Sequence, residues 1–334
     1  MAMTRPAGAP SVSPVPVSPL STRRRPRAPV RRGRPSGRAG ADHLGYLVYL
    51  MPGLLLFTGV IVVPFVMTLG VSLTEWPGIG APRWVGLGNY RTLLSDREFW
   101  ASFRHNVALI VAMAIIPTCA GLVLAAALTD VIGKRFGART ASVLRACVYL
   151  PQLLPIVTAG IVWSWILGPD GGAVNELFKA VGLESLAHDW LGDPSTAMGG
   201  VMVVMVWIQV GFPLVVFMAG LQRVDPSLYE AAEIDGASWW RRFRHIAIPQ
   251  MRPEIFVCLL WCTIASLKAF APIYVLTKGG PGGATNVPSY SSYQNFFEKT
   301  DVGYGSAIAT VLTSIIVVLT VVFLRIQSKD MGEQ

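Results

Sequence analysis

A short polar stretch between two apolar segments has residue types suited to binding another protein. The sequence EAA at 230–232 is followed after three residues by Gly236, and after nine more by IAIP at 246–249. The stretch carries acids first and arginines after, and Gly236 between them can take the positive φ of a sharp turn. The pattern predicts a surface that holds a partner protein rather than a catalytic centre.

Two short helices are expected to present this surface. The sequence DPS at 225–227 suits a helix start, and Gly236 can end that helix in the left-handed conformation. A second helix is expected over 239–244, ending before Pro249. The first helix would carry acidic residues and the second would carry arginines. Together they would form an angled projection that fits a cleft in another protein. The alternative is an ordinary loop stabilised by pairs of side chains four residues apart.

Enzymatic chemistry finds little support in the sequence. No GxxxxGK[ST] sequence occurs, so the chain lacks the loop that cradles ATP phosphates. Cys258 and Cys262 are one helical turn apart without a histidine or carboxylate beside them, which favours packing over metal binding. The histidines fall in loops or at segment ends, which disfavours an intramembrane enzyme: His43, His105, His188 and His245. We expect no catalytic residue, cofactor or metal.

The composition is that of a membrane protein. Of 334 residues, 52% are hydrophobic and 14% charged, whereas soluble domains carry about 25% charged residues. Spanning the bilayer takes about 20 apolar residues, and backbone groups in lipid must be paired internally, so apolar segments of that length are helices. Six qualify: 45–73, 104–128, 143–167, 199–221, 254–277 and 304–325. The predicted fold class is an all-α polytopic membrane protein. Kinks are expected at Pro52, Pro64, Pro117, Pro155, Pro213 and Pro272.

The distribution of basic residues predicts the orientation. Lysines and arginines outside the spans concentrate on the side of the N-terminus, which places both termini in the cytoplasm. The loop 222–253, between the fourth and fifth spans, is then cytoplasmic. The loop 168–198 lies outside and carries five carboxylates against one lysine. It can contact a docked binding protein or serve only as a solvated connection.

Residues 1–43 are rich in Arg, Pro, Ser, Gly and Ala without an apolar period, which predicts a disordered basic cytoplasmic tail near anionic lipid. A twin-arginine export signal is disfavoured because a full span follows and no A-x-A site ends it. Nucleic-acid binding is disfavoured because no folded basic domain accompanies the arginines. The expected division is this tail, a six-helix domain at 44–326, and a second cytoplasmic tail at 327–334.

The EAA-x3-G-x9-I-x-I-P spacing resembles the EAA loop of permease subunits of binding-protein-dependent ABC importers. The consensus has leucine where this chain has Ile248. The stretches GLGNYRTLL at 86–94 and IYVLTKGGPGGAT at 273–285 are similar to carbohydrate-uptake permeases, of the type of the larger maltose-system membrane subunit. The resemblance covers roughly residues 44–326.

This resemblance implies the type I ABC importer permease fold, with six transmembrane helices and a cytoplasmic coupling loop between helices 4 and 5. The implied partners are a second homologous permease subunit, a dimer of ATPase subunits, an extracellular solute-binding protein and the lipid bilayer. The implied activity is import of a sugar by alternating access, with ATP hydrolysed on the separate subunit. Glycerol-3-phosphate is the alternative solute, because its importer is of the same type. The implied coupling residues are Glu230, Ala231, Ala232, Gly236, Ile246 and Pro249.

A polyhydroxylated solute needs polar groups and aromatic faces inside the helix bundle, where polar residues are costly. Gln209 and Phe212 share a face of the fourth span. Trp261 and Lys268 share a face of the fifth span, with Ser266 on the neighbouring strip. These five residues are the candidate solute pathway. For Gln209, Ser266 and Lys268, hydrogen bonding between packed helices is an equally good interpretation.

Overall fold

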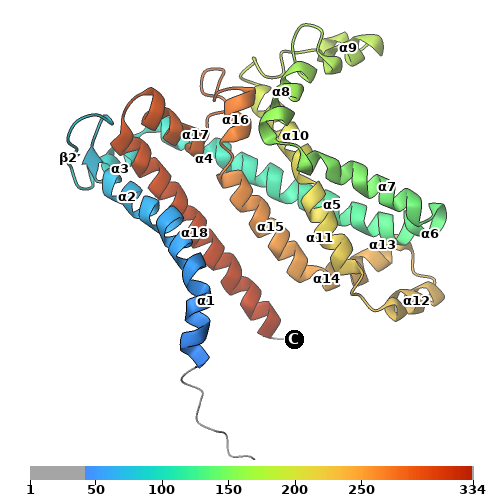
Figure 1. Cartoon of the computed structure of the whole chain (residues 1–334). Coiled ribbons are helices and arrows are strands. Elements are labelled where there is room, and N and C mark those ends of the chain that lie inside the picture. Colours follow the sequence, from blue (N-terminus) through green and yellow to red (C-terminus); the bar gives the residue numbers. More distant parts are fainter. Residues whose placement is uncertain (1–41, 333–334) are drawn as a thin grey trace, which may run out of the picture. The chain divides into compact units, whose positions relative to one another are not determined.

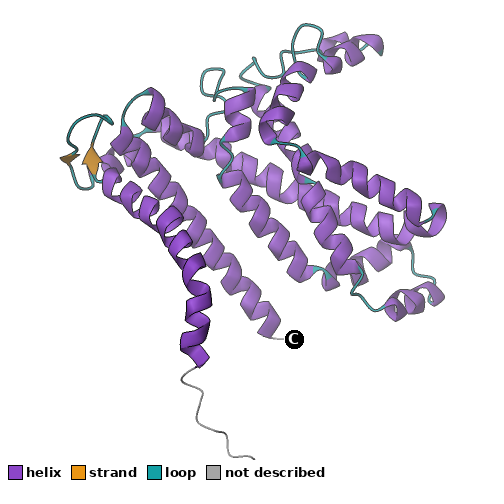
Figure 2. Cartoon of the chain, viewed as in Figure 1, coloured by secondary structure: helices purple, strands orange, loops and turns teal. Residues whose placement is uncertain are grey.

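The computed structural model describes residues 42–332, which are helical over most of their length (Figure 1, Figure 2). The chain divides into two compact units, Met1–Leu56 and Phe57–Gln334. Helix α1 (Asp42–Phe57) is the described part of the first unit. The tail predicted at 1–43 therefore lies outside the described residues, apart from the two that begin α1.

The second unit contains every other element. Its first half holds α2 (Val63–Ser72), β1 (Thr74–Glu75), β2 (Arg83–Trp84), α3 (Gly88–Ser95), α4 (Arg97–Ile110), α5 (Ile116–Ala126), α6 (Gly133–Phe136), α7 (Ala138–Tyr149), α8 (Ile156–Ile166) and α9 (Ala173–Ala180). Its second half holds α10 (Ala197–Gln209), α11 (Gly211–Leu221), α12 (Pro226–Ile234), α13 (Trp239–Arg242), α14 (Ile248–Gln250), α15 (Arg252–Leu267), α16 (Ala271–Leu276), α17 (Pro288–Tyr293) and α18 (Val302–Gly332). The strands form one antiparallel ladder of two residues each, a small departure from the all-α prediction.

Four helical stretches of the described chain are long and apolar enough to cross a membrane: Tyr49–Ser72, Arg97–Ile132, Ala197–Leu221 and Val302–Gln327. A fifth candidate is the pair Ala138–Leu153 and Ile156–Ile166, bent by 101°. The predicted span 254–277 is not one helix, since α15 ends at Leu267 and α16 begins at Ala271. Helix α18 continues to Gly332, so the predicted tail after residue 326 begins as helix.

Prolines change the helices in two ways. Before Pro64, Pro117 and Pro249, the helix widens into a π turn that ends two residues before the proline. Because proline has no N–H to donate, a wider turn re-pairs the carbonyls and lets the helix continue. The segment at Pro155 instead bends by 101°. The predicted kink is therefore confirmed at Pro155, whereas Pro64 and Pro117 lie within continuous helical stretches.

The buried core connects helices distant in sequence. Helices α5 and α11 pack along one another, and their side chains Leu122, Leu214 and Phe217 share one cluster with Phe243 and Met251 from the segment before α15. A second cluster joins α4, α10 and α16, and α18 packs against α2 and α17 (Figure 1). The segment between α11 and α15 is thus anchored in the core of the bundle.

Candidate functional site

Helix α12 carries the EAA sequence, and its start is capped. The Asp225 carboxylate accepts a hydrogen bond from the Ser227 N–H at 2.9 Å. This bond, to an amide with no partner inside the helix, holds the pKa of the Asp225 carboxyl below its ordinary value. Pro226 occupies the first turn, where its missing N–H costs nothing. The helix begins where the sequence predicts.

The end of α12 is a tight turn at Gly236. Its φ is +70°, which glycine adopts without a steric penalty. The Ala237 N–H donates to the Ala232 carbonyl at 2.9 Å and the Gly236 N–H donates to the Glu233 carbonyl at 3.1 Å, so the last carbonyls are paired. The predicted role of Gly236 as the turn residue is confirmed.

The second helical segment is longer than the sequence predicts. We expect it to end before Pro249, but helical structure runs from Trp239 to Gln250 through α13, a π turn at Phe243–Ala247 and α14. The π turn provides the re-pairing that Pro249 requires, so this expectation is wrong. Pro249 lies inside a helix and does not terminate it.

An ion-pair clamp holds the two helical segments together. The Arg242 guanidinium lies 2.8 Å from the Asp130 carboxylate and 3.2 Å from the Glu233 carboxylate. The side chains of Arg242 and Asp130 are only 14% and 11% exposed. Asp130 belongs to the helical turn after α5, whereas Glu233 is on α12. The clamp therefore connects the loop to the end of the helix that begins at Arg97.

The predicted coupling residues divide by exposure. Glu230, Ala231, Gly236 and Pro249 are exposed, Ala232 is half-buried, and Ile246 packs against the core under the loop. Glu230 also lines a cavity of about 310 Å³ beneath the EAA helix, together with Asp130, Glu233 and the aromatic rings of Trp239 and Phe243. The carboxylate of the EAA sequence, Glu230, thus lies at a cavity lined by acidic and aromatic residues.

The five candidate pathway residues fall into two groups. Phe212 stacks on Trp261, with ring centroids 5.3 Å apart, and Trp261 is 53% exposed. Lys268, at the end of α15, is also exposed. Gln209 and Ser266 are buried instead, and the Gln209 amide donates to the Cys262 sulfur at 3.3 Å. Only the first group is open to a ligand in this conformation.

The buried group includes a residue that the sequence analysis missed. Asn106 on α4 is fully buried, and its amide nitrogen donates to the Ser266 carbonyl at 3.2 Å. The Asn106 side-chain oxygen and the Ser266 hydroxyl are buried without a hydrogen-bond partner. We call Asn106, Gln209, Cys262 and Ser266 the polar seam. The sequence signal for Asn106 was an asparagine inside an apolar run. The corresponding signal for Asp130 was a lone carboxylate directly after the same run.

The GGPGGAT sequence forms a compact turn. Gly279 has a φ of +74°, and a Cβ there would lie 2.7 Å from the Tyr290 ring. Thr285 is fully buried, and its hydroxyl donates to the Gly280 carbonyl at 2.8 Å. The turn therefore supports Tyr290, which belongs to a cluster of rings with Phe270, Tyr274 and Tyr293.

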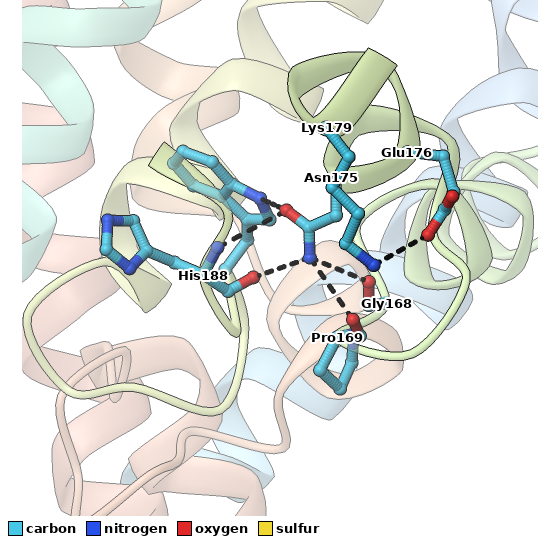
Figure 3. Close-up of polar contacts among 7 residues, drawn as sticks. Gly168, Pro169, Asn175, Glu176, Lys179 and His188 are labelled. Carbon is cyan, nitrogen blue, oxygen red and sulfur yellow. Dashed lines mark hydrogen bonds and ion pairs between the residues drawn. The ribbon is translucent and has the colours of Figure 1, made fainter. Parts of the chain in front are cut away.

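The acidic loop 168–198 is organised around one buried asparagine (Figure 3). The Asn175 amide nitrogen donates to the carbonyls of Gly168, Pro169 and His188, and its oxygen accepts from the Trp190 indole at 2.8 Å. Asn175 is 2% exposed, whereas Glu176 and Lys179 form an exposed ion pair beside it. The predicted acidic loop is thus folded around a buried asparagine and keeps the Glu176–Lys179 ion pair on its surface.

Comparisons with known proteins agree with this architecture. The profile of the family described as "Binding-protein-dependent transport system inner membrane component" matches residues 119–332. The permease protein of the trehalose/maltose transport system of Thermococcus litoralis is 34% identical over 284 residues, covering 85% of this chain and 93% of the relative. The permease protein of the diacetylchitobiose uptake system of Streptomyces coelicolor is 32% identical over 305 residues, covering 88% and 86%.

A solved structure has the same fold. It is a chain of a bacterial alginate ABC transporter in complex with an alginate pentasaccharide-bound periplasmic protein. The TM-score is 0.73 with 22% sequence identity, and the match covers 85% of this chain and 93% of the other. The likeness establishes that the helices are arranged as in an ABC importer permease.

Proposed function

Because this chain belongs to the family of inner membrane components of binding-protein-dependent transport systems, we propose that it is a permease subunit of an ATP-driven importer that carries a sugar. The solutes named for the two relatives are trehalose or maltose and diacetylchitobiose, and the importer of similar fold carries alginate. All are carbohydrates. Glycerol-3-phosphate, the alternative solute, is not favoured by this set.

The proposed partners follow from the same assignment. The structurally similar importer is in complex with a periplasmic binding protein, so a solute-binding protein is expected to dock on the outer loops, including the surface built on Asn175. A second permease subunit and two ATPase subunits complete the proposed assembly. Hydrolysis of ATP belongs to the ATPase subunits.

The proposed topology has six crossings with both termini in the cytoplasm. In this arrangement the bent pair α7–α8 is one crossing and α15 with α16 is another. At the break, the N–H groups of residues 268–270 all donate to nearby carbonyls, so the chain can interrupt the helix within a membrane without leaving these donors unpaired. The domain limits proposed are 1–43, 44–326 with the coupling loop at 222–253, and 327–334.

Coupling is proposed to run through α12 and the clamp. A force applied at Glu230 reaches α11 and α15 along the chain, and it reaches the end of α5 through the contact of Arg242 with Asp130 at 2.8 Å. Part-buried charged hydrogen bonds resist separation because each partner left alone would be poorly solvated. The loop can therefore move as one body with three helices. This clamp is the observation that carries the proposal.

The solute pathway is proposed along the faces of α11 and α15. The stacked rings of Phe212 and Trp261 offer an exposed aromatic surface for a sugar ring, and Lys268 offers an exposed charge. The polar seam supplies further groups when the helices separate, because the Ser266 hydroxyl and the Asn106 oxygen are already without partners. Alternating access would expose these groups in turn to the two sides.

The test is purification of the tagged chain from its native membrane, with Glu230→Arg beside it. We expect the wild type to retain a second permease and an ATPase subunit, and the variant to lose the ATPase. Asp235→Arg is the matched control, since it reverses an exposed acid in the same loop. Retention of the full partner set and of sugar uptake by Glu230→Arg would contradict the coupling role. A wild-type chain purified alone would contradict the assembly.

A further inference from the structure

An apolar cavity of about 290 Å³ lies between α3, α4 and α18, away from the coupling loop and the proposed pathway. Its walls include Leu94, Trp100 and Phe103 on one side and Ile315 on the other. Leu94 is 68% and Trp100 45% exposed, so the cavity opens to the surface. Both α4 and α18 belong to stretches apolar enough to cross a membrane, so this opening faces the region where lipid lies.

The walls of the cavity are almost entirely apolar and offer water little to bind. Its two polar wall groups already have partners: the Tyr90 hydroxyl lies 2.6 Å from the Ser72 hydroxyl, and the Trp100 indole N–H donates to the Leu94 carbonyl at 3.0 Å. Water occupies a cavity stably only where it finds two or more polar partners. A hydrocarbon chain can pack against these apolar walls, and the surrounding bilayer supplies such chains.

The rim of the cavity is basic. Arg97 and Arg104 lie three residues before and four residues after Trp100, which places all three on one face of α4. Arg91 follows Tyr90 on α3. The three arginines are exposed, and no ion pair or hydrogen bond from their side chains is found within residues 42–332.

The acids nearby are already engaged. The Asp96 carboxylate accepts from the Tyr304 hydroxyl at 2.5 Å and from the Glu98 N–H at 2.8 Å. The Glu98 carboxylate lies 3.8 Å from the Lys299 ammonium. The arginines at the rim thus remain available to an external anion. Guanidinium groups bind phosphate oxygens through paired N–H donors.

We propose that this cavity and its arginine rim form a binding site for a phospholipid with an anionic headgroup. The acyl chain fills the cavity beside Trp100 and Ile315, and the headgroup phosphate pairs with Arg97 and Arg104. The site ties α3 and α4 to α18 through a bound lipid, and it is independent of the solute that the permease carries.

The test uses the intact purified transporter titrated with phosphatidylglycerol or phosphatidylcholine and followed by native mass spectrometry. We expect phosphatidylglycerol to bind about tenfold more tightly, a preference that Arg97→Gln/Arg104→Gln abolishes. Ile315→Trp, which fills the cavity, is expected to weaken both lipids, whereas Ile315→Ala keeps them. Arg135→Gln/Arg139→Gln removes two exposed charges elsewhere and is expected to bind as the wild type does. Thermal unfolding of each variant monitors folding.

Equal binding of the two lipids by the wild type would overturn the anionic headgroup. Unchanged lipid binding by Ile315→Trp would overturn the cavity as the acyl site. A third variant is Leu94→Cys, treated in the membrane with a thiol-reactive cross-linker. A cross-link to the second permease subunit would show that protein, rather than lipid, covers the cavity, and would also refute the proposal. None of these outcomes bears on the sugar-import assignment, which the partner set of the Glu230 variant tests separately.

Discussion

The coupling loop and the polar seam differ in how far their buried polar groups are paired. In the loop, the part-buried Arg242 pairs with two carboxylates and leaves only its Nε without a partner, and α12 is capped at both ends. In the seam, the Asn106 oxygen and the Ser266 hydroxyl are fully buried and unpaired. Satisfied polar networks are rigid, whereas unpaired polar groups cost free energy that a ligand or a conformational change can recover. We propose that the paired loop transmits movement and that the unpaired seam responds to it.

The largest expected effect is at the clamp. Arg242→Ala removes the arginine that links Asp130, at the end of the α5 helix, to Glu233 on α12, and breaking a part-buried ion pair destabilises the site. We expect sugar uptake to fall more than tenfold while the permease and ATPase subunits still purify together. Uptake into proteoliposomes and the ATPase activity with and without the loaded binding protein provide the measurement.

Arg241→Ala is the control for the clamp, because Arg241 is exposed and its neighbour carries the ion pairs. The exchange Asp130→Arg/Arg242→Asp is expected to restore part of the uptake. If Arg242→Ala and Arg241→Ala transport equally well, the clamp has no role in coupling.

The next largest effect is expected on the exposed face. Trp261→Ala removes the ring that stacks on Phe212. On the proposed pathway the sugar stacks on this ring, a contact worth about 1 kcal/mol, so the KM for uptake should rise about fivefold with kcat little changed. Trp165→Ala, at a tryptophan that is 75% exposed, is the control and should leave KM unchanged. An unchanged KM for Trp261→Ala would remove this face from the pathway.

A smaller effect separates a pathway role from a packing role in the seam. Ser266→Ala deletes a hydroxyl that has no partner in this conformation, so thermal stability should be unchanged or slightly higher. A pathway role predicts a rise in KM of about threefold. Ser102→Ala is the matched control, since that buried hydroxyl donates to the Phe99 carbonyl at 2.7 Å. It should lower stability and leave KM alone. Lower thermal stability with an unchanged KM in Ser266→Ala would assign Ser266 to packing.

The smallest effect concerns the cap of α12. The pKa of Asp225 is lowered in the fold, so its contribution is present above the ordinary carboxyl pKa and disappears as pH falls through the lower folded value. The protection factors of the amides over residues 227–230, which are corrected for the slower intrinsic exchange in acid, should therefore fall on acidification from about pH 6 to about pH 3. Asp225→Asn, which caps without a charge, should remove this pH dependence. An identical loss of protection in both proteins would show that Asp225 does not control it.

The sequence predicts local features well where a single residue type imposes them. Gly236 ends α12 because a positive φ favours glycine, and Asp225 starts it because a short carboxylate reaches free amides. It predicts helix continuity less well. At Pro117 and Pro249 a π turn precedes the proline and the helix continues, whereas the chain bends at Pro155. The difference depends on whether the carbonyls before the proline can find other hydrogen-bond donors.

The amino-acid sequence by itself determines the membrane character, the position of the EAA helix and the family, since these depend on apolar length, local caps and a fixed spacing of residues. Tertiary structure alone decides which polar residues work together. Arg242 meets Asp130, and Asn106 meets Ser266, across separations of 112 and 160 residues. No local preference encodes such pairs. They arise because α5 packs on α11 and α4 packs on α15, which brings isolated polar groups into contact inside an apolar bundle.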